Sequence, residues 1–330
     1  MGRRNLVVFM TLLVAGCRGN QNVFNPAGPA ARSIATLGWV LLAICGVVYV
    51  LVLMALAWSL LRHRRESDAS VETEARLTRV VTSATAVIVA TLVAIAISSW
   101  AAERRLIAPS GAGAVTIDAI GHQWWWEFQY HDVSPSEIVT SPNELRLPAG
   151  VPIVIKAMSR DVIHSFWVPN LQGKRDLVPG QITHLWLMAD REGVFRGQCA
   201  EYCGHQHANM AFPVIVESMP RFRQWLAQQR KSAAAPDGGE AQRGETIFLQ
   251  STCAMCHTVR GTSAGSRVGP DLTHVGSRLT LAAGTLPNTR QHLARWISDA
   301  QLVKPGSRMP SHGLSPHDLD AVVAYLRSLR

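Results

Sequence analysis

The longest apolar stretches of the chain lie near its N-terminus and are long enough to cross a lipid bilayer. The run 34–61 has no charged residue over 28 positions, and the run 80–100 has none over 21. A membrane-spanning helix needs about 20 apolar residues, so the two runs predict a transmembrane helical hairpin within residues 34–105. The connector between them is basic, with Arg62, His63, Arg64, Arg65, Arg76 and Arg79. Cytoplasmic loops carry the excess of Lys and Arg, so both chain ends are expected on the outer side of the membrane.

A shorter apolar run precedes the spans and predicts an export signal. Two arginines are followed by the apolar stretch 6–14, which is too short to span a bilayer and has the layout of a signal peptide. The stretch ends in V-A-G-C, which resembles a bacterial lipoprotein signal. We therefore expect residues 1–16 to be removed and Cys17 to be lipidated, followed by a lead-in over 17–33. An ordinary signal followed by a chance cysteine is the alternative.

Residues 106–231 alternate between short apolar runs and turn signals, which is the pattern of a β domain. Eight runs have the length of strands: 115–120, 124–130, 144–147, 151–157, 163–168, 182–188, 193–196 and 211–216. Many short strands at close spacing predict a sandwich or a barrel. Residues 220–231 place their apolar side chains on one side and predict a closing helix. Residues 232–240 are rich in Ala and Gly and predict a flexible linker.

Helical periodicity returns in the C-terminal segment 241–330. Three helices are predicted over 239–250, 291–300 and 316–329. The sequence Cys253-Ala254-Met255-Cys256-His257 is a C-x-x-C-H attachment signal for c-type haem, so the segment predicts a small all-α domain. Cys253 and Cys256 would tether the porphyrin, and His257 would be the proximal iron ligand. A thioredoxin-like pair or a zinc pair is the alternative, but neither needs the adjacent histidine.

The second axial ligand of such a haem must come from downstream. Met309, in Arg308-Met309-Pro310, matches the cytochrome c pattern. The competing residues are His274, His292, His312 and His317. Ligation by Met and His raises the haem potential, so Met309 is the predicted ligand for an electron carrier.

Residues 199–210, C-A-E-Y-C-G-H-Q-H-A-N-M, predict a metal-binding loop. Thiolates, imidazole and thioether suit copper or zinc and do not suit calcium or magnesium. One Cys, His and Met would hold one copper ion, whereas two cysteines can bridge two. A structural zinc site is the alternative, although a methionine ligand fits zinc poorly. His164 ends a β run 35 residues before Cys199, where a copper-binding Greek-key sandwich typically places a further ligand.

The distribution of charged residues and the positions of the cysteines exclude some classes of function. The net charge is +9, but residues 106–231 hold 11 basic and 11 acidic groups and are balanced. Residues 241–330 hold 10 basic and 5 acidic groups. Because no helix clusters Lys and Arg and no aromatic RNA-binding signature occurs, nucleic acid is not an expected partner. The six cysteines are taken up by the lipoprotein signal, an apolar span and the two redox motifs, so none remains for a disulfide framework.

These features together resemble one family. The loop C-x-E-x-C-G-x-x-H-x-x-M, the upstream segment 161–164, the sequence G-H-Q-W-W-W at 121–126 and the two spans are similar to cytochrome c oxidase subunit II. With the C-terminal cytochrome c, the whole chain resembles the caa3-type members of that family. The resemblance implies three parts: a transmembrane hairpin, a cupredoxin-like Greek-key β-sandwich and a class I cytochrome c domain.

The resemblance also implies roles for single residues. It implies a dinuclear copper centre, CuA, with ligands His164, Cys199, Glu201 (through its carbonyl), Cys203, His207 and Met210. The two cysteines would bridge the coppers, the two histidines would cap them, and the methionine would be a weak axial ligand. The Glu201 carboxylate would reach a magnesium or manganese ion at the interface with subunit I. Trp124 would be the point at which electrons enter the copper domain, and His205 falls outside the pattern.

The implied function is electron input to a proton-translocating cytochrome c oxidase. Electrons would pass from an external donor through haem c to CuA and then to haem a of subunit I, where oxygen is reduced. The expected partners are subunits I and III, membrane lipid, and a cytochrome c or bc1-type donor. The expected location is the bacterial inner membrane, with two spans and both termini periplasmic. The alternatives are a CuA protein similar to nitrous oxide reductase and a lipoprotein that stores or delivers copper.

Overall fold

The computed structural model describes residues 19–61, 71–104, 115–131 and 138–330. The predicted signal peptide, Cys17 and the basic residues between 62 and 70 lie outside the described residues. The chain divides into two compact units: Arg32–Ala108 is one, and Met1–Ala31 together with Pro109–Arg330 is the other.

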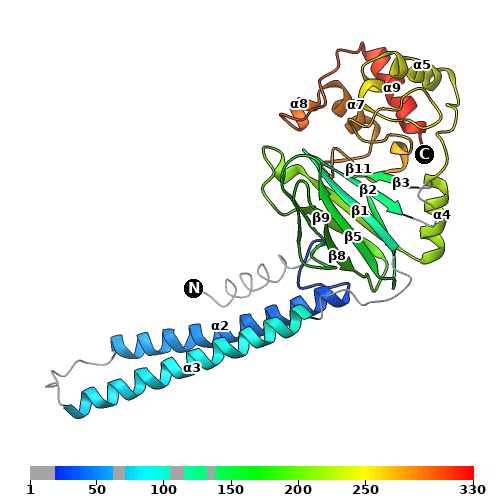
Figure 1. Ribbon diagram of the computed structural model, residues 1–330. Helices are drawn as coiled ribbons and strands as arrows, with labels where there is room; N and C mark the ends of the chain where they lie inside the picture. The colour runs from blue at the N-terminus through cyan, green and yellow to red at the C-terminus, as the bar shows by residue number, and fades with distance from the viewer. Residues whose placement is uncertain (1–18, 62–70, 105–114, 132–137) are drawn as a thin grey trace, which may run out of the picture. The chain divides into compact units, whose positions relative to one another are not determined.

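The first of these units holds two long apolar helices (Figure 1). They are α2 (Pro29–Leu61) and α3 (Val71–Arg104), with mean hydropathies of 2.9 and 2.5 over their most apolar windows. Neither window is buried within the protein, so the apolar side chains need a lipid environment. The two predicted spans are therefore confirmed as helices. Helix α3 begins before the apolar run, and Glu72 and Glu74 in its first turn suit the positive end of the helix dipole.

The β domain consists of two five-stranded sheets (Figure 1). The first has the order β3-β2-β1-β5-β8, with β1 Val115–His122, β2 Trp125–His131, β3 Val139–Pro142, β5 Ile153–Ser159 and β8 Thr183–Leu187. The second has the order β4-β10-β9-β6-β7, with β4 Leu145–Pro148, β6 His164–Trp167, β7 Arg175–Leu177, β9 Gly193–Cys199 and β10 Ala211–Glu217. One pair in each sheet is parallel, β1 with β5 and β4 with β10. This arrangement confirms the predicted cupredoxin-like sandwich.

Alternating side chains of β2 supply the aromatic centre of the sandwich. Trp126, Phe128 and Tyr130 are buried, because every second residue of a strand faces the same side. Phe166 from β6 and Phe212 from β10 meet Phe128 from the opposite sheet, with ring centroids 6.4 Å and 5.1 Å away. A core of this size holds both sheets firmly enough to position the loops at their ends.

The β domain has two strands that the sequence pattern did not predict, β3 and β7, and one strand that starts later than predicted. The strand predicted to start at Trp124 starts at Trp125, and Trp124 lies in the turn between β1 and β2. The lead-in segment is hydrogen-bonded to the sandwich: the Asn170 side-chain amide donates to the carbonyls of Asn22 and Asn25 at 3.0 Å and 2.9 Å. The helix predicted over 220–231 is α4 (Met219–Gln229), with a proline in its first turn.

The C-terminal domain is built mainly from helices. They are α5 (Gly239–Gln250), α6 (Cys253–Cys256), α7 (Arg290–Ser298), α8 (Ala300–Val303) and α9 (Pro316–Ser328). Helices α5 and α9 can cross closely because Gly244 has no Cβ; a Cβ at this position would collide with the Ala321 carbonyl. A two-stranded ladder, β11 (Thr280–Leu281) and β12 (Leu286–Pro287), was not expected from the helical pattern.

The predicted flexible linker is partly fixed to this domain. The Ala233 amide donates to the Arg260 carbonyl at 2.9 Å, and His274 Nε2 lies 3.1 Å from the Lys231 carbonyl. Residues 231–233 are therefore packed against the C-terminal domain.

Candidate functional site

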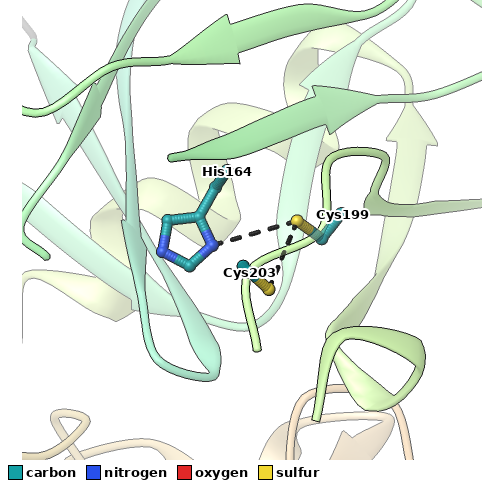
Figure 2. A group of neighbouring side chains, drawn as sticks. All are labelled: His164, Cys199 and Cys203. Carbon is teal, nitrogen blue, oxygen red and sulfur yellow. Dashed lines mark hydrogen bonds between the residues drawn. The ribbon is translucent and has the colours of Figure 1, made fainter. Parts of the chain in front are cut away.

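Four side chains at one end of the second sheet bring sulfur and nitrogen atoms together. Cys199 Sγ lies 3.8 Å from His164 Nδ1 and 3.7 Å from Cys203 Sγ (Figure 2). Cys203 Sγ in turn lies 3.6 Å from His207 Nδ1. The ligand atoms of His164, Cys199 and Cys203 all fall within 4.8 Å of one another, and all three residues are buried.

The remaining predicted ligands complete the same cluster. Met210 Sδ lies 3.8 Å from Cys203 Sγ, and the Glu201 carbonyl lies 3.2 Å from Cys199 Sγ. The Glu201 carboxylate points elsewhere: it is 42% exposed and lies 3.3 Å from Lys174 Nζ. We refer to residues 199–210 as the copper loop.

The ends of the loop are fixed by the sheet. Its first residue, Cys199, ends β9, and its amide donates to the Met210 carbonyl at 2.9 Å just before β10 begins. Across the sandwich, Gly121 lies against His164, and a Cβ there would stand 2.7 Å from the ring carbon Cδ2. Only glycine therefore leaves room for this imidazole.

Asp161 fixes the orientation of the His164 ring. Its Oδ1 lies 2.8 Å from His164 Nε2, which leaves Nδ1 directed at the thiols. The same carboxylate accepts the amides of Gln123 and Val162 at 2.7 Å and 2.8 Å. Burial acts to raise the pKa of Asp161, but these hydrogen bonds outweigh it and the pKa is lowered. The carboxylate is therefore charged, and a carboxylate on the outer nitrogen is a common support for a metal-binding histidine.

The two thiols contact each other at 3.7 Å, and the contact shifts their pKa values in opposite directions. The hydrogen bond from Cys203 lowers the pKa of Cys199 to about 3, with burial opposing and the His164 contact assisting. The same contact and burial raise the pKa of Cys203. A metal ion that displaces the thiol protons would bind both thiolates. The set of two thiols, two imidazoles, a thioether and a carbonyl, of which His164, Cys199, Cys203 and Met210 are buried, fits copper, because soft sulfur and imidazole ligands select it.

An apolar cavity lies between the C-terminal domain and the β domain, and the C-x-x-C-H residues line it. Cys253, Cys256 and His257 line it, together with Phe248, Val275, Leu293, Ile297 and Leu326 among others. His257 Nδ1 lies 2.8 Å from the Pro270 carbonyl, which leaves Nε2 for iron. Burial lowers the pKa of His257, so the ring is neutral and can bind a metal. Gly269 borders the ring, since a Cβ there would stand 2.8 Å from its Cε1. The cavity fits a haem.

Two of the candidate second ligands lie at this cavity. Met309 and His312 both line it, whereas His274 Nε2 lies 3.1 Å from the Lys231 carbonyl and His292 Nδ1 lies 2.8 Å from Thr289 Oγ1. The Met309 carbonyl accepts the Gln301 amide at 2.7 Å, so the loop that carries the methionine is held in place.

Trp124 connects the two sites. Its indole Nε1 donates to the Cys203 carbonyl at 2.9 Å, and Gln123 Nε2 donates to the same carbonyl at 2.9 Å. Trp124 also lines the cavity of the C-terminal domain. One aromatic side chain thus contacts the copper loop and the edge of the other cavity. His205, which the sequence pattern left out, is exposed.

Comparison with known proteins agrees with this arrangement. Residues 134–219 match the family model "Cytochrome C oxidase subunit II, periplasmic domain", and residues 241–330 match "Cytochrome c". Cytochrome c oxidase subunit 2 of Alkalihalophilus pseudofirmus is 33% identical over 98% of this chain and 95% of that protein. The chain belongs to the cytochrome c oxidase subunit II family. Subunit II proteins of Bacillus sp. strain PS3 and Bacillus subtilis are 35% and 30% identical over 66% of this chain, and over 62% and 63% of their own lengths.

Membership of the subunit II family confirms the main functional prediction. The chain is the electron-input subunit of a haem-copper terminal oxidase and belongs to a complex with subunit I. Its subunit II domain implies a CuA copper centre, and its cytochrome c domain implies haem c. The matches do not favour the nitrous oxide reductase or copper-delivery alternatives. The two apolar helices fit a membrane protein with two spans.

Three supporting residues were not singled out by sequence reasoning. Asp161 appeared only as context for His164, and Gln123 only as a letter beside the tryptophans. Lys304 was not considered, although it is the single lysine in residues 241–330.

Proposed function

We propose that this subunit II binds CuA through His164, Cys199, Cys203, His207, Met210 and the Glu201 carbonyl. The support is the convergence of all these groups at one point, with S···N and S···S separations of 3.6–3.8 Å and with His164, Cys199, Cys203 and Met210 buried. Copper held by these residues would supply a centre that accepts and releases one electron. The chain's own part is to fix the ligands and to exclude water from them.

We propose that haem c is attached to Cys253 and Cys256, with His257 and Met309 as axial ligands. The bond from His257 Nδ1 to the Pro270 carbonyl holds the imidazole in the orientation that presents Nε2. Met309 and His312 both line the cavity, and Met309 is preferred because Arg308-Met309-Pro310 matches the cytochrome c pattern and Met/His ligation raises the haem potential, as an electron carrier needs.

Trp124 carries the proposed route between the two centres. Its ring borders the haem cavity and its indole N–H is bonded to the carbonyl of Cys203, a copper-bridging residue in this proposal. This single hydrogen bond is the observation on which the route depends. It joins the two sites through one side chain and one peptide group.

The remaining assignments concern the surroundings of the subunit. The Glu201 carboxylate is exposed enough to bind magnesium or manganese with subunit I, provided that Lys174 releases it. A periplasmic location of both termini, lipidation of Cys17, contact with subunit III and a cytochrome c or bc1-type donor complete the proposal. Mass spectrometry of the mature N-terminus tests the lipidation, and an intact Met1 would refute it.

Replacing Trp124 with phenylalanine tests the route. Phenylalanine keeps an aromatic ring but removes the N–H that bonds to Cys203. We expect the purified oxidase to keep its mixed-valence dicopper EPR signal and its c-type optical spectrum, while haem-to-CuA electron transfer after a light pulse becomes slower. An unchanged transfer rate would remove Trp124 from the route. A single-copper signal or zinc in the unmodified protein would overturn the CuA assignment itself.

The axial ligand is tested separately. Met309→Ala should lower the haem potential and open the iron to added imidazole. If His312→Ala has these effects and Met309→Ala does not, His312 is the ligand.

A further inference from the structure

Lys304 is the least expected charged residue of the cytochrome domain. It follows α8 and is the only lysine in residues 241–330, which contain nine arginines. Its exposed fraction is 3%. A buried lysine is rare unless its ammonium group is fully bonded, so the partners of Lys304 define what the residue does.

All three partners of the Lys304 ammonium are main-chain carbonyls. Nζ donates to the Trp124 carbonyl at 2.7 Å and to the Asn209 carbonyl at 2.9 Å, both in the copper domain. It donates to Ala282 of its own domain at 3.2 Å. An ammonium group has three protons that spread in three directions, which matches this set. The flat guanidinium of arginine does not offer that geometry.

Burial removes the Lys304 ammonium group from water, which costs solvation free energy. Burial lowers its pKa to about 7. The three carbonyls offset the loss of water around the ammonium group.

Other bonds between the two domains surround this contact. Gln206 Nε2 donates to the Pro305 carbonyl at 2.8 Å, and the Ala211 amide donates to the Ala283 carbonyl at 3.0 Å. At a third point, the Leu279 amide donates to Glu144 Oε2 at 3.0 Å. We define the docking contact as residues 279–285 and 304–306 of the cytochrome domain with Trp124, Glu144 and 206–211 of the copper domain.

The turn between β11 and β12 is shaped for this contact. Ala282, Ala283 and Gly284 have φ angles of 51°, 57° and 76°. Two consecutive alanines in the left-handed region are uncommon, and such strain persists only where the surroundings enforce it. The turn directs the Ala282 carbonyl at Lys304 and the Ala283 carbonyl at the Ala211 amide, one residue after the copper loop.

We propose that Lys304 is a positioning residue that holds the cytochrome domain on the copper loop beside Trp124. The inference rests on the proposed ligands and on the proposed role of Trp124. Transfer moves one electron from the haem, which is oxidised, to the dicopper centre, which is reduced. Lys304 exchanges neither electron nor proton in that step. It fixes the separation of the two centres.

The test replaces Lys304 with methionine in the complete oxidase. Methionine keeps a similar length but leaves the Trp124 and Asn209 carbonyls without their donor. Loss of one charged hydrogen bond corresponds to about a tenfold or larger change in the docking equilibrium. We therefore expect hydrogen exchange at the amides of Ala211 and Leu279 to become at least about tenfold faster, and electron transfer from haem to CuA to become slower.

The controls separate docking from folding and from charge. Arg295→Met removes one exposed positive charge from the same domain and should change neither readout. Lys304→Arg keeps the charge but not the geometry and should behave like Lys304→Met. If the methionine variant lacks either metal centre, Lys304→Gln, which has a shorter polar side chain, is measured in its place.

The outcomes distinguish this inference from the proposed function. If the unmodified oxidase shows both spectroscopic signals and Lys304→Met has unchanged exchange and unchanged transfer, Lys304 does not position the domain. The same holds if Arg295→Met reproduces the effects. If the unmodified oxidase itself lacks the dicopper or c-type signal, it is the proposed function that fails.

Discussion

Changing Asp161 to asparagine tests the support of the copper site. The carboxylate accepts three hydrogen bonds, from His164 Nε2 at 2.8 Å, the Val162 amide at 2.8 Å and the Gln123 amide at 2.7 Å. His164 and Val162 share Oδ1, and Gln123 uses Oδ2. Asparagine has the same shape but replaces one oxygen with an N–H₂ group. Whichever way the amide lies, at least one donor then faces another donor.

The size of the effect follows from this geometry. A donor left without its acceptor in a partly buried site costs about 1–3 kcal/mol. Loss of the negative charge also removes the group that holds His164 with Nδ1 toward the thiols. Changes to such outer partners typically weaken metal binding by about 10–100-fold, which corresponds to a similar free energy. We therefore expect Asp161→Asn to lower copper affinity by about 10–100-fold.

The assay is a competition between the purified oxidase and a copper chelator, followed by the dicopper EPR signal. Asp118→Asn is the matched control, because Asp118 Oδ2 lies 2.8 Å from His131 Nε2 in the same sheet and His131 is not part of the metal cluster. The control should retain the affinity of the unmodified protein. If Asp161→Asn binds copper within about threefold of that protein, the carboxylate does not orient the ligand, since the predicted loss of 1–3 kcal/mol corresponds to a larger factor.

Three further predictions concern packing, haem support and pH. Gly197→Ala should lower the free energy of unfolding of the copper domain by about 1–3 kcal/mol, because the new Cβ would collide with the Phe212 ring. Thermal unfolding measures this, and an unchanged melting temperature would show that the ring moves aside freely. Gln301→Leu removes the hydrogen bond from the Gln301 side-chain amide to the Met309 carbonyl, so it should destabilise the loop that carries Met309 by about 1–3 kcal/mol. Added imidazole should then bind the haem faster than in the unmodified protein, and equal binding rates would contradict this prediction. Bonds from Ser315 and Arg243 lower the pKa of Asp318 below its ordinary value of 3.8, so its stabilisation is present above that value and is lost as the pH falls through the lowered pKa. The melting temperature of Asp318→Asn should therefore fall less steeply below pH 4 than that of the unmodified chain, and parallel curves would contradict this.

Much of the site could be predicted from sequence because its residues are close together in the chain. The copper loop places most of its donors within 12 positions, 199–210, and C-x-x-C-H is continuous. His164 is distant, but a strand end with a characteristic context indicated it. The two spans could also be predicted, because an uninterrupted apolar run of about 20 or more residues has few structures open to it other than a membrane helix.

What could not be predicted depends on contacts between distant segments. Lys304 meets Trp124 across 180 positions, and its partners are main-chain carbonyls, which carry no side-chain signature. The β11–β12 turn uses left-handed alanines, which sequence preference would not place there. Strand β2 starts at Trp125 and not at the predicted Trp124, because the Trp124 side chain is hydrogen-bonded to the Cys203 carbonyl and the residue lies in the preceding turn.

The fixed linker sets how far the cytochrome domain can travel. Arg260 and His274 hold the chain at residues 231–233, directly after α4 ends at Gln229. Even if two or three residues there were fully extended, they would reach only about 10 Å. A cytochrome domain released from the docking contact would therefore stay at an effective concentration of about millimolar or more relative to CuA. Dilution of the oxidase should not slow this internal step, and donor concentration should affect only the delivery of electrons to the cytochrome domain.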